Sequence, residues 1–183
     1  MQDFNTRKIA FAGVVAAIYV ALTMAVAPLS YGPIQFRIAE VLCILPFFFP
    51  ITVPALFIGC VIANLLSPYG ILDVVAGSAA SLLAALCTMQ IGRASREATA
   101  FKGFAFKAFA CFPPVILNAV IIGAVIAISI TGGGAAFWPA FLVNGIHVGV
   151  GQMGVLYCIG LPLMIYLPKS RFFKSFSSAP LIK

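Results

Sequence analysis

Apolar residues form six runs along the chain, and the segments between them are richer in glycine, proline and polar residues. A helix that crosses the hydrocarbon core of a bilayer needs roughly 20 apolar residues, and a helix satisfies its own backbone hydrogen bonds in lipid. The runs therefore predict an all-α membrane protein with six transmembrane helices. We expect these helices at residues 9–28, 38–49, 53–66, 74–91, 108–130 and 140–167.

The second and third helices have the least defined boundaries, because Pro46 and Pro50 lie between them and proline bends or ends a helix. The first apolar run is long and lacks a small-residue cleavage site, so we expect it to stay in the mature protein as a helix. Six helices with short loops fill residues 1–183, which predicts a single integral membrane domain.

The overall composition agrees with a lipid environment. Hydrophobic residues make up 63% of the 183 residues and charged residues 8%, whereas an ordinary soluble domain has about 25% charged residues. A water-soluble fold of this size could not cover so much apolar side chain with so few charges.

The basic residues lie in three clusters that flank the apolar runs. The net charge of +7 alone could also suggest nucleic acid as a partner, but Lys and Arg concentrate in the cytoplasmic loops of membrane proteins. We therefore place all three clusters, the connection at residues 92–107 and both termini in the cytoplasm, and the loops at 30–37 and 131–139 outside. The clusters are Arg7 and Lys8; Arg93, Arg96, Lys102 and Lys107; and Lys169, Arg171 and Lys174.

The five cysteines each lie in an apolar stretch without a partner at metal-ligand spacing. We expect them to be buried free thiols that act as small hydrophobic residues, with no disulfide framework and no metal site. They are Cys43, Cys60, Cys87, Cys111 and Cys158.

Small residues repeat along one face of the first predicted helix. Small residues four apart allow another helix to approach closely, so this face either packs inside the protein or docks onto a separate membrane partner, and the spacing does not distinguish the two. Gly145 and Gly149 form a similar face that we expect to pack internally. The first face consists of Gly13, Ala17, Ala21 and Ala25, with Ala12 and Ala16 beside it.

Four ionisable residues lie at or near membrane depth outside the basic clusters. A charge in hydrocarbon costs at least about 2.5–3.5 kcal/mol, so such a group needs a partner or a wet cavity. Arg37 and Glu40 are three residues apart and could pair on one helix face, or contact a ligand. Asp73 either caps the fourth predicted helix or contacts a ligand. His147 either packs through a hydrogen bond or contacts a ligand.

Neutral polar residues accompany these charges in the half of the membrane that we place outside. A buried amide without a partner is destabilising, and helix–helix hydrogen bonds would explain each residue singly. Together the residues favour a polar pocket between helices that opens to the outside. They are Gln35, Asn64, Tyr69, Asn118, Asn144 and Gln152.

The sequence contains no phosphate-binding loop of the form G-x-x-x-x-G-K-[ST], no H-E-x-x-H and no G-x-S-x-G. We therefore expect the chain not to be an enzyme and not to hydrolyse ATP by that route. No cofactor and no nucleic-acid partner is indicated.

Two long segments resemble the queuosine-precursor transporter family: YGPIQFRIAEVLCILPFF at residues 31–48 and LFIGCVIANLLSPYGILDVVAGSAASLLAAL at residues 56–86. PPVILNAVIIG at 113–123 and VGVGQMGVLYCIGLPL at 148–163 are also similar to it, so the resemblance covers nearly the whole chain. The more specific motifs are I-Q-F-R-x-x-E and L-D-V-V-x-G-S. Members of the family are substrate-binding S components of energy-coupling-factor (ECF) transporters.

The resemblance implies a six-helix S component in the bacterial plasma membrane, with a substrate pocket near the outer face and a lid formed by the first loop. It implies that the small-residue face of the first helix docks onto a transmembrane coupling subunit. Two cytoplasmic ATPases would supply the energy. The implied substrate is a 7-deazaguanine such as 7-aminomethyl-7-deazaguanine.

This implied substrate suggests roles for the polar residues. Its guanine edge presents N–H donors that suit carboxylate or amide acceptors, its ring carbonyl needs a donor, and its aminomethyl cation favours an acid or an aromatic face. The candidate acceptors are Glu40, Asp73, Asn118 and Gln152; the candidate donors are Gln35, Asn64, Asn144 and His147; and the candidate cation partners are Tyr69, Asp73 and Trp138.

Three other functions stay open from the sequence. The chain could be an S component for another vitamin. An autonomous ion-coupled carrier would use Glu40, Asp73 and His147 as proton sites and would transport solute without any ATPase. An intramembrane enzyme would use Asp73 or Glu40 with His147 as acid and base, although no motif supports it.

Overall fold

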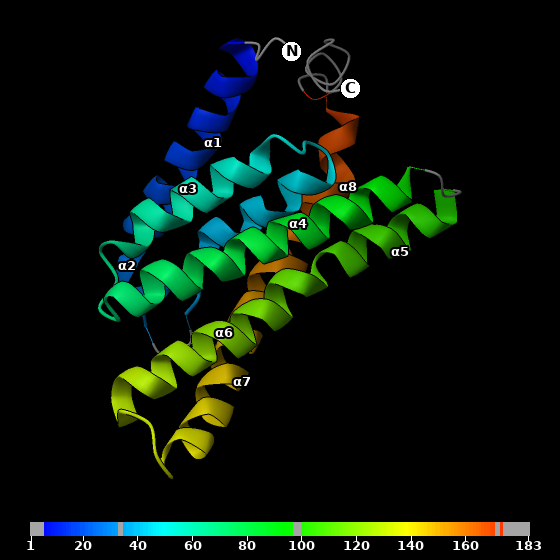
Figure 1. Cartoon of the computed structure of the whole chain (residues 1–183). Helices are drawn as coiled ribbons and strands as arrows, with labels where there is room; N and C mark the ends of the chain where they lie inside the picture. Colours follow the sequence, from blue (N-terminus) through cyan, green and yellow to red (C-terminus); the bar gives the residue numbers. More distant parts are fainter. Residues whose placement is uncertain (1–5, 33–34, 97–99, 171–172, 174–183) are drawn as a thin grey trace.

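The computed structural model of the chain is a bundle of helices (Figure 1). It describes residues 6–32, 35–96, 100–170 and 173, without the side chains of residues 7 and 100–102. Arg171 and Lys174 of the third basic cluster, and residues 33 and 34 of the first predicted loop, lie outside the described residues. The α-helices are α1 Thr6–Ala25, α2 Ala27–Ser30, α3 Thr52–Asn64, α4 Ser78–Ser95, α5 Ala100–Ala110, α6 Phe112–Thr131, α7 Phe137–Val155 and α8 Leu161–Tyr166; the 3₁₀ helices are η1 Ile38–Phe47 and η4 Leu167–Lys169; and the π-helical turns are η2 Asp73–Gly77 and η3 Leu156–Gly160.

Four helical stretches of the described chain are long and apolar enough to cross a membrane. The apolar helices η1 and α3 are shorter. The prediction of an all-α fold is thus confirmed for the described residues, while the count of six transmembrane helices stays a prediction. The four stretches are Lys8–Ala25, Asp73–Ser95, Gly103–Thr131 and Phe137–Lys169.

The helices pack in chain order around η1. α1 packs on α3, α3 on α4, α4 on α6 and α6 on α7, and η1 contacts α1, α4, α7 and η3. Most side chains of η1 are buried, so this short helix carries its residues in the middle of the bundle. In Figure 1, α1 begins and α8 ends at one end of the bundle, opposite the turn between α6 and α7.

Close contact between α6 and α7 depends on small residues. A Cβ on Gly145 would lie 3.0 Å from the Ala119 backbone oxygen, and Gly149 faces the Ala119 Cβ at 3.4 Å. The prediction that this glycine face of α7 packs internally is therefore confirmed.

Proline and glycine explain where α6 begins and ends. Pro113 and Pro114 lie in its first turn, where a helix tolerates residues without an N–H. Because they have no N–H, they cannot donate to carbonyls of α5, so α5 ends before them and the two helices meet at Cys111. Gly132 ends α6 in the left-handed conformation with a φ of 65°, and its N–H donates to the Ile128 oxygen.

The predicted connection at residues 92–107 is largely helical, which corrects the sequence-based boundary. α4 continues to Ser95 and α5 begins at Ala100. Lysine is a good helix former, so it does not end a helix. Its long stem can also lie along apolar surface while the ammonium reaches water, and Lys107 is half-buried. Charge suggested a loop, but residues 100–110 contain no proline to end the helix.

Two further predictions need correction. The segment at 38–49 is helical only to Phe47 and forms a 3₁₀ helix with Pro46 inside it. A proline ring clashes with the carbonyl of residue i−4 in an α-helix, so Pro46 disfavours the regular α-helix that was predicted. Trp138, predicted in the outer turn, lies in the first turn of α7, where the proline that follows it is tolerated.

The cysteines are all free, but they are not all buried. Cys43, Cys60 and Cys111 are buried, whereas Cys87 and Cys158 are exposed on the outside of the bundle. The expectation of burial fails for these two because a position that faces lipid has apolar neighbours just as a core position does.

Candidate functional site

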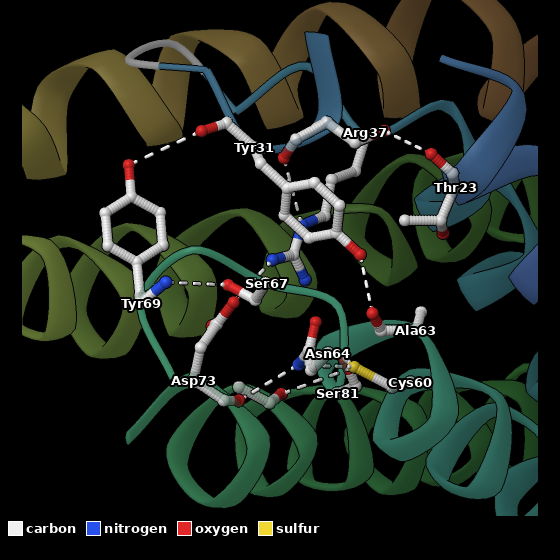
Figure 2. A network of polar contacts seen from close by, with 12 residues as sticks. Thr23, Tyr31, Arg37, Cys60, Ala63, Asn64, Ser67, Tyr69, Asp73 and Ser81 are labelled. Carbon is white, nitrogen blue, oxygen red and sulfur yellow. Dashed lines mark hydrogen bonds and ion pairs between the residues drawn. The ribbon is translucent and has the colours of Figure 1, made fainter. Parts of the chain in front are cut away.

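A buried ion pair joins Arg37 and Asp73 (Figure 2). Arg37 Nη2 lies 3.0 Å from Asp73 Oδ2, and the two side chains are 3% and 0% exposed. Arg37 immediately precedes η1, and Asp73 is the first residue of η2. Each charge needs the other here, because an unpaired charge buried in a membrane protein is strongly destabilising.

The predicted pairing of Arg37 with Glu40 is wrong. Arg37 has an extended backbone with φ −85° and ψ 98°, so its side chain leaves the helix face on which the sequence placed both residues. Glu40 instead accepts hydrogen bonds from the Tyr19 hydroxyl at 2.6 Å and from the Cys43 thiol at 3.0 Å. Glu40 therefore ties α1 to η1 and uses both of its carboxylate oxygens.

Asp73 does not cap the helix that it begins, so the capping alternative is also wrong. Leu72 occupies the capping position of η2, and no side chain makes a capping hydrogen bond there. Asp73 Oδ2 binds Arg37, whereas Oδ1 is buried and has no hydrogen-bond partner among the described residues. The π-helical turn is a form of backbone found frequently at functional sites.

Asn64 brings a second unpaired oxygen next to Asp73. Its Nδ2 donates to the Asp73 backbone oxygen at 3.0 Å and to Cys60 Sγ at 3.3 Å, and Ser81 donates to the same sulfur at 3.2 Å. A backbone oxygen can only accept, so this bond fixes which end of the Asn64 amide is nitrogen. Asn64 Oδ1 is buried and finds no partner in the described part of the chain.

Gly77 allows Asn64 and Asp73 to lie where they do. A Cβ on Gly77 would be 2.6 Å from Asn64 Nδ2 and 2.7 Å from Asp73 Oδ1, closer than atoms of this kind approach without a bond. Gly77 is the glycine of the L-D-V-V-x-G-S motif, but sequence reasoning gave it no role in the site. Its place in that motif, four residues after Asp73 and so on a neighbouring position of a helix surface, was the signal that could have identified it.

Two tyrosines, Tyr31 and Tyr69, support the ion pair. The Tyr31 ring lies beside the Arg37 guanidinium, with 5.3 Å from the ring centre to Cζ (Figure 2), and its hydroxyl donates to the Ala63 oxygen at 2.6 Å. Burial raises the pKa of this hydroxyl, so it stays a donor. Tyr69, predicted as a ligand contact, donates to the Tyr31 backbone oxygen at 3.4 Å. Sequence reasoning missed Tyr31, although it lies in the same loop as Arg37.

Gln35 has a strained backbone in the turn before Arg37. Its φ of 49° is in the left-handed region, which is rare for a residue other than glycine and costs of order 1–3 kcal/mol. The Gln35 backbone N–H donates to the Gly32 backbone oxygen at 3.0 Å, and the Gln35 backbone oxygen accepts from the Arg37 backbone N–H at 2.8 Å. Strain of this kind is concentrated at ligand sites, and here the turn orients Arg37.

Asn118 on α6 and Gln152 on α7 lie at one level of the bundle. Ile122, one turn after Asn118, and Val148, one turn before Gln152, belong to the same buried apolar cluster. Because the two helices run in opposite directions, both amides lie to the same side of this cluster. Asn118 Nδ2 and Gln152 Oε1 are buried, and neither has a partner among the residues that the structure describes.

This level adjoins the ion pair. Ile122 Cδ1 lies 3.3 Å from the position of a Gly77 Cβ, so α6 meets η2 at the turn that carries Asp73. Ser78 Oγ and Gln35 Nε2 are likewise buried without a described partner. We call the buried polar residues of this region the polar layer: Gln35, Arg37, Asn64, Asp73, Ser78, Asn118 and Gln152.

Besides Glu40 and Tyr69, whose hydrogen bonds are described above, three further residues predicted to contact substrate lie outside the polar layer. His147 is exposed, and Trp138 is 66% exposed and packs against two phenylalanine rings of α7. Asn144 is half-buried and donates to the Ala140 oxygen of its own helix at 2.7 Å, a local bond that competes with any ligand contact. The structure therefore does not bring these three together with Asp73.

The small residues of α1 divide between two sides of the helix. Ala12 and Ala16 pack against the buried cluster that α1 shares with η1, α3 and α4, as the internal alternative predicted. Gly13, Ala17 and Ala21 are exposed, and among the described residues nothing lies within 4 Å of a Cβ on Gly13.

The polar layer has the chemistry to bind a polar molecule with several N–H donors. Three described buried residues near it carry a formal charge: Arg37, Glu40 and Asp73. One positive and two negative formal charges sum to one net negative charge. Within the described residues, no group of three or more His, Cys, Asp or Glu side chains could hold a metal. Counting only partners in the described part of the chain, the unpaired acceptors belong to Asn64, Asp73 and Gln152 and the unpaired donors to Gln35 and Asn118, and the unpaired Ser78 hydroxyl can donate or accept.

Comparisons with known proteins identify relatives of the chain. Residues 9–169 match the sequence model of a family described as QueT transporter. A curated protein, the queuosine precursor transporter QueT of Lactococcus lactis subsp. cremoris (strain MG1363), is 41% identical over 85 residues, which are 45% of this chain and 50% of that protein. The chain thus spans about half the length of the curated relative that it matches. No solved structure matches the chain.

Proposed function

The chain belongs to the QueT transporter family and is a multi-pass protein of the cell membrane, and on this basis we propose that it binds a queuosine precursor in the polar layer during uptake. The relative in Lactococcus lactis is a queuosine precursor transporter, which supports this substrate class. We take the substrate to be a 7-deazaguanine, such as 7-aminomethyl-7-deazaguanine, that enters from the outside.

The observation that carries the proposal is the set of six buried polar atoms in the polar layer that have no partner among the described residues. A buried polar atom without a hydrogen bond costs about 1–3 kcal/mol, and native proteins keep few of them. Six such atoms in one region of a small protein offer a polar molecule several positions for hydrogen bonds. A bound polar molecule that hydrogen-bonds to these atoms would offset that cost.

A 7-deazaguanine carries groups that match the polar layer. Its ring N–H groups and exocyclic amine donate hydrogen bonds, and its ring carbonyl accepts them. The amides of Asn118 and Gln152 each present a donor beside an acceptor, which suits the mixed edge of a guanine ring. Gln35 Nε2 suits the ring carbonyl, and the oxygens of Asn64 and Asp73 suit N–H donors.

We further propose that the chain is the S component of an ECF transporter and that α1 docks onto the transmembrane coupling subunit. Gly13, Ala17 and Ala21 form an exposed face of small residues, and such a face lets another helix approach closely. Two cytoplasmic ATPases would supply the energy, since the chain has no phosphate-binding loop of its own.

A binding assay on the purified full chain tests the substrate. In titration calorimetry we expect 7-aminomethyl-7-deazaguanine to bind one molecule per chain and to raise the thermal unfolding temperature, because bound ligand stabilises the folded state. Riboflavin, thiamine and biotin serve as controls that should not bind. Tight binding of one of these without binding of any 7-deazaguanine would overturn the substrate assignment.

Tryptophan substitutions on α1 test the docking. Ala17→Trp and Ala21→Trp should abolish co-purification with the coupling subunit and leave 7-deazaguanine binding intact, because a large ring prevents the close approach of helices. Ala105→Trp, at an exposed position of α5, is the matched control and should retain co-purification. Retention of the complex by both α1 variants would contradict the docking proposal.

Transport in liposomes separates this proposal from an ion-coupled carrier. We expect no uptake of 7-aminomethyl-7-deazaguanine by liposomes that contain the chain alone, and ATP-dependent uptake after the coupling subunit and ATPases are added. Uptake by the chain alone, driven by a proton gradient, would overturn the ECF assignment and leave the binding site unaffected.

A further inference from the structure

Two of the unpaired atoms in the polar layer, Asn64 Oδ1 and Asp73 Oδ1, belong to neighbouring side chains. Both residues are 0% exposed. Asn64 Nδ2 donates to the Asp73 backbone oxygen, and Asn64 Nδ2 and Asp73 Oδ1 would lie 2.6 Å and 2.7 Å from a Cβ on Gly77. Figure 2 shows Asn64, the last residue of α3, next to Asp73, the first residue of η2. Two neighbouring side chains therefore each carry a buried acceptor that has no donor among the described residues.

We propose that Asn64 and Asp73 form a subsite for a primary ammonium group of the substrate, and that Gly77 is the positioning residue of this subsite. The inference rests on the proposed function, because it assigns one part of the same polar layer. It names the chemical group of the substrate that the site recognises, and it names the residues that recognise this group.

The hydrogen-bonding capacity of the subsite fits an ammonium group. An ammonium group has three N–H donors and no acceptor, and it forms charge-assisted bonds of about 2.7–2.9 Å to oxygen. Asp73 Oδ1 is a carboxylate oxygen, and Asn64 Oδ1 is an amide oxygen whose orientation is fixed by the Nδ2 bonds. One compact cation can satisfy both oxygens at once.

The charges near the subsite also favour a cation. Arg37 is held by Asp73 Oδ2, by the Ser30 oxygen at 3.3 Å from its Nε, and by the Tyr31 ring. Glu40 and Asp73 bring two formal negative charges against the single positive charge of Arg37. An anionic group would find the guanidinium already paired, whereas a cation balances the remaining charge.

The other predicted cation partners are less well placed. The Tyr69 hydroxyl is already bonded to the Tyr31 backbone oxygen. Trp138 is 66% exposed on α7 and packs against neighbouring rings of its own helix. Of the three predicted cation partners, Asp73 is thus the one that is buried and has an oxygen without a hydrogen-bond partner among the described residues.

Gly77 acts through the position of its neighbours. A methyl group at this position would contact the flexible ends of Asn64 and Asp73 rather than backbone atoms. We therefore expect Gly77→Ala to fold and to push both side chains away from their present positions. The two oxygens would then no longer match one ammonium group, although the rest of the polar layer would be unchanged.

The test compares two ligands that share a ring. 7-Aminomethyl-7-deazaguanine carries the ammonium group, and 7-cyano-7-deazaguanine carries a neutral nitrile in its place. The purified full chain should bind the amine at least about 30-fold more tightly than the nitrile, as expected for the loss of a charge-assisted hydrogen bond. Gly77→Ala, Asp73→Asn and Asn64→Ala should each bring this ratio toward one.

The affinity ratio separates recognition of the amine from a general structural role, because a merely structural change would weaken both ligands equally. Gly103→Ala is the matched control: Gly103 is also helical, has open space around it in the described structure, and should keep the wild-type ratio. Asn64→Ala keeps the Arg37–Asp73 pair and so tests the subsite even if Asp73→Asn does not fold.

The outcomes distinguish the subsite from the proposed function. Equal affinity of the wild-type chain for amine and nitrile would overturn the ammonium subsite and leave the queuosine-precursor site intact. A wild-type ratio that persists in both Gly77→Ala and Asn64→Ala would overturn the residue assignment. If neither ligand binds the wild-type chain, the proposed function itself fails.

Discussion

Two buried carboxylates in this protein, Glu40 and Asp73, are used in different ways. Both are at most 1% exposed. Glu40 accepts one hydrogen bond at each oxygen, from Tyr19 and from Cys43. Asp73 binds Arg37 through one oxygen, and its other oxygen has no partner among the described residues. Burial of an acid in a membrane protein is therefore not enough to indicate a ligand site, whereas an oxygen without a described partner leaves a hydrogen bond that a ligand can make.

The surroundings of the two acids explain the difference. Glu40 lies on η1 against α1, and the residues around it belong to an apolar cluster that includes Tyr19, Cys43 and Cys60. Asp73 lies on a π-helical turn beside further unpaired groups of Asn64 and Ser78. The region around Glu40 holds helices together, and the region around Asp73 leaves hydrogen bonds for a bound molecule to make.

The largest expected effect comes from breaking the ion pair. Arg37→Met alone and Asp73→Leu alone should each lower the free energy of unfolding by about 3–5 kcal/mol, because each leaves an unpaired buried charge. The double variant should recover most of that loss, since neither charge remains. Ligand binding should be absent from all three. Thermal unfolding and titration calorimetry measure these quantities, and a double variant that is no more stable than the singles would contradict the account.

A smaller effect is expected at the carboxylate that is already satisfied. Tyr19→Phe should lower the free energy of unfolding by about 1–3 kcal/mol, because Glu40 loses a hydrogen bond inside the bundle. The affinity for 7-aminomethyl-7-deazaguanine should change by less than about threefold, within the scatter expected for a residue without ligand contact. Tyr166→Phe is the control, since Tyr166 is 67% exposed. A large loss of affinity in Tyr19→Phe would remove the contrast between the two acids.

The smallest change in stability is expected at the amides of the polar layer, and it has the opposite sign. Asn118→Leu should raise the free energy of unfolding of the empty protein by about 1 kcal/mol, because an unpaired buried amide nitrogen is removed. It should also weaken ligand binding about tenfold. Asn144→Leu is the matched control, since Asn144 bonds to its own helix, and it should leave affinity unchanged. A destabilised Asn118→Leu protein with normal affinity would show that Asn118 serves packing.

Much of the helix content could be predicted from the sequence, because apolar runs of this length have few alternatives in lipid. The boundaries were less predictable. Charge at residues 92–107 suggested a loop, but the lysines of α5 are compatible with a helix. η1 contains Pro46 and contacts several helices, and a local pattern does not reveal these tertiary contacts.

The polar residues of the site could be identified from the sequence, but their pairing could not. Arg37 and Asp73 are 36 residues apart, so their contact depends on how the helices pack. The exposed positions of Trp138 and His147 were also unpredictable, because lipid and protein interior are both apolar and a helix between them has no polar face to show its orientation. The role of Gly77 could not be predicted, because this residue contributes only the space that it leaves for Asn64 and Asp73.

Identification by mass of the small molecule that co-purifies with the chain shows whether the polar layer holds a 7-deazaguanine. The chain would be produced in cells supplied with 7-aminomethyl-7-deazaguanine and purified in mild detergent. We predict that wild-type protein retains this 7-deazaguanine at one molecule per chain and that the Arg37→Met, Asp73→Leu double variant, which should still fold, retains none. A wild-type protein that carries no small molecule and is not stabilised by any added 7-deazaguanine would contradict the account.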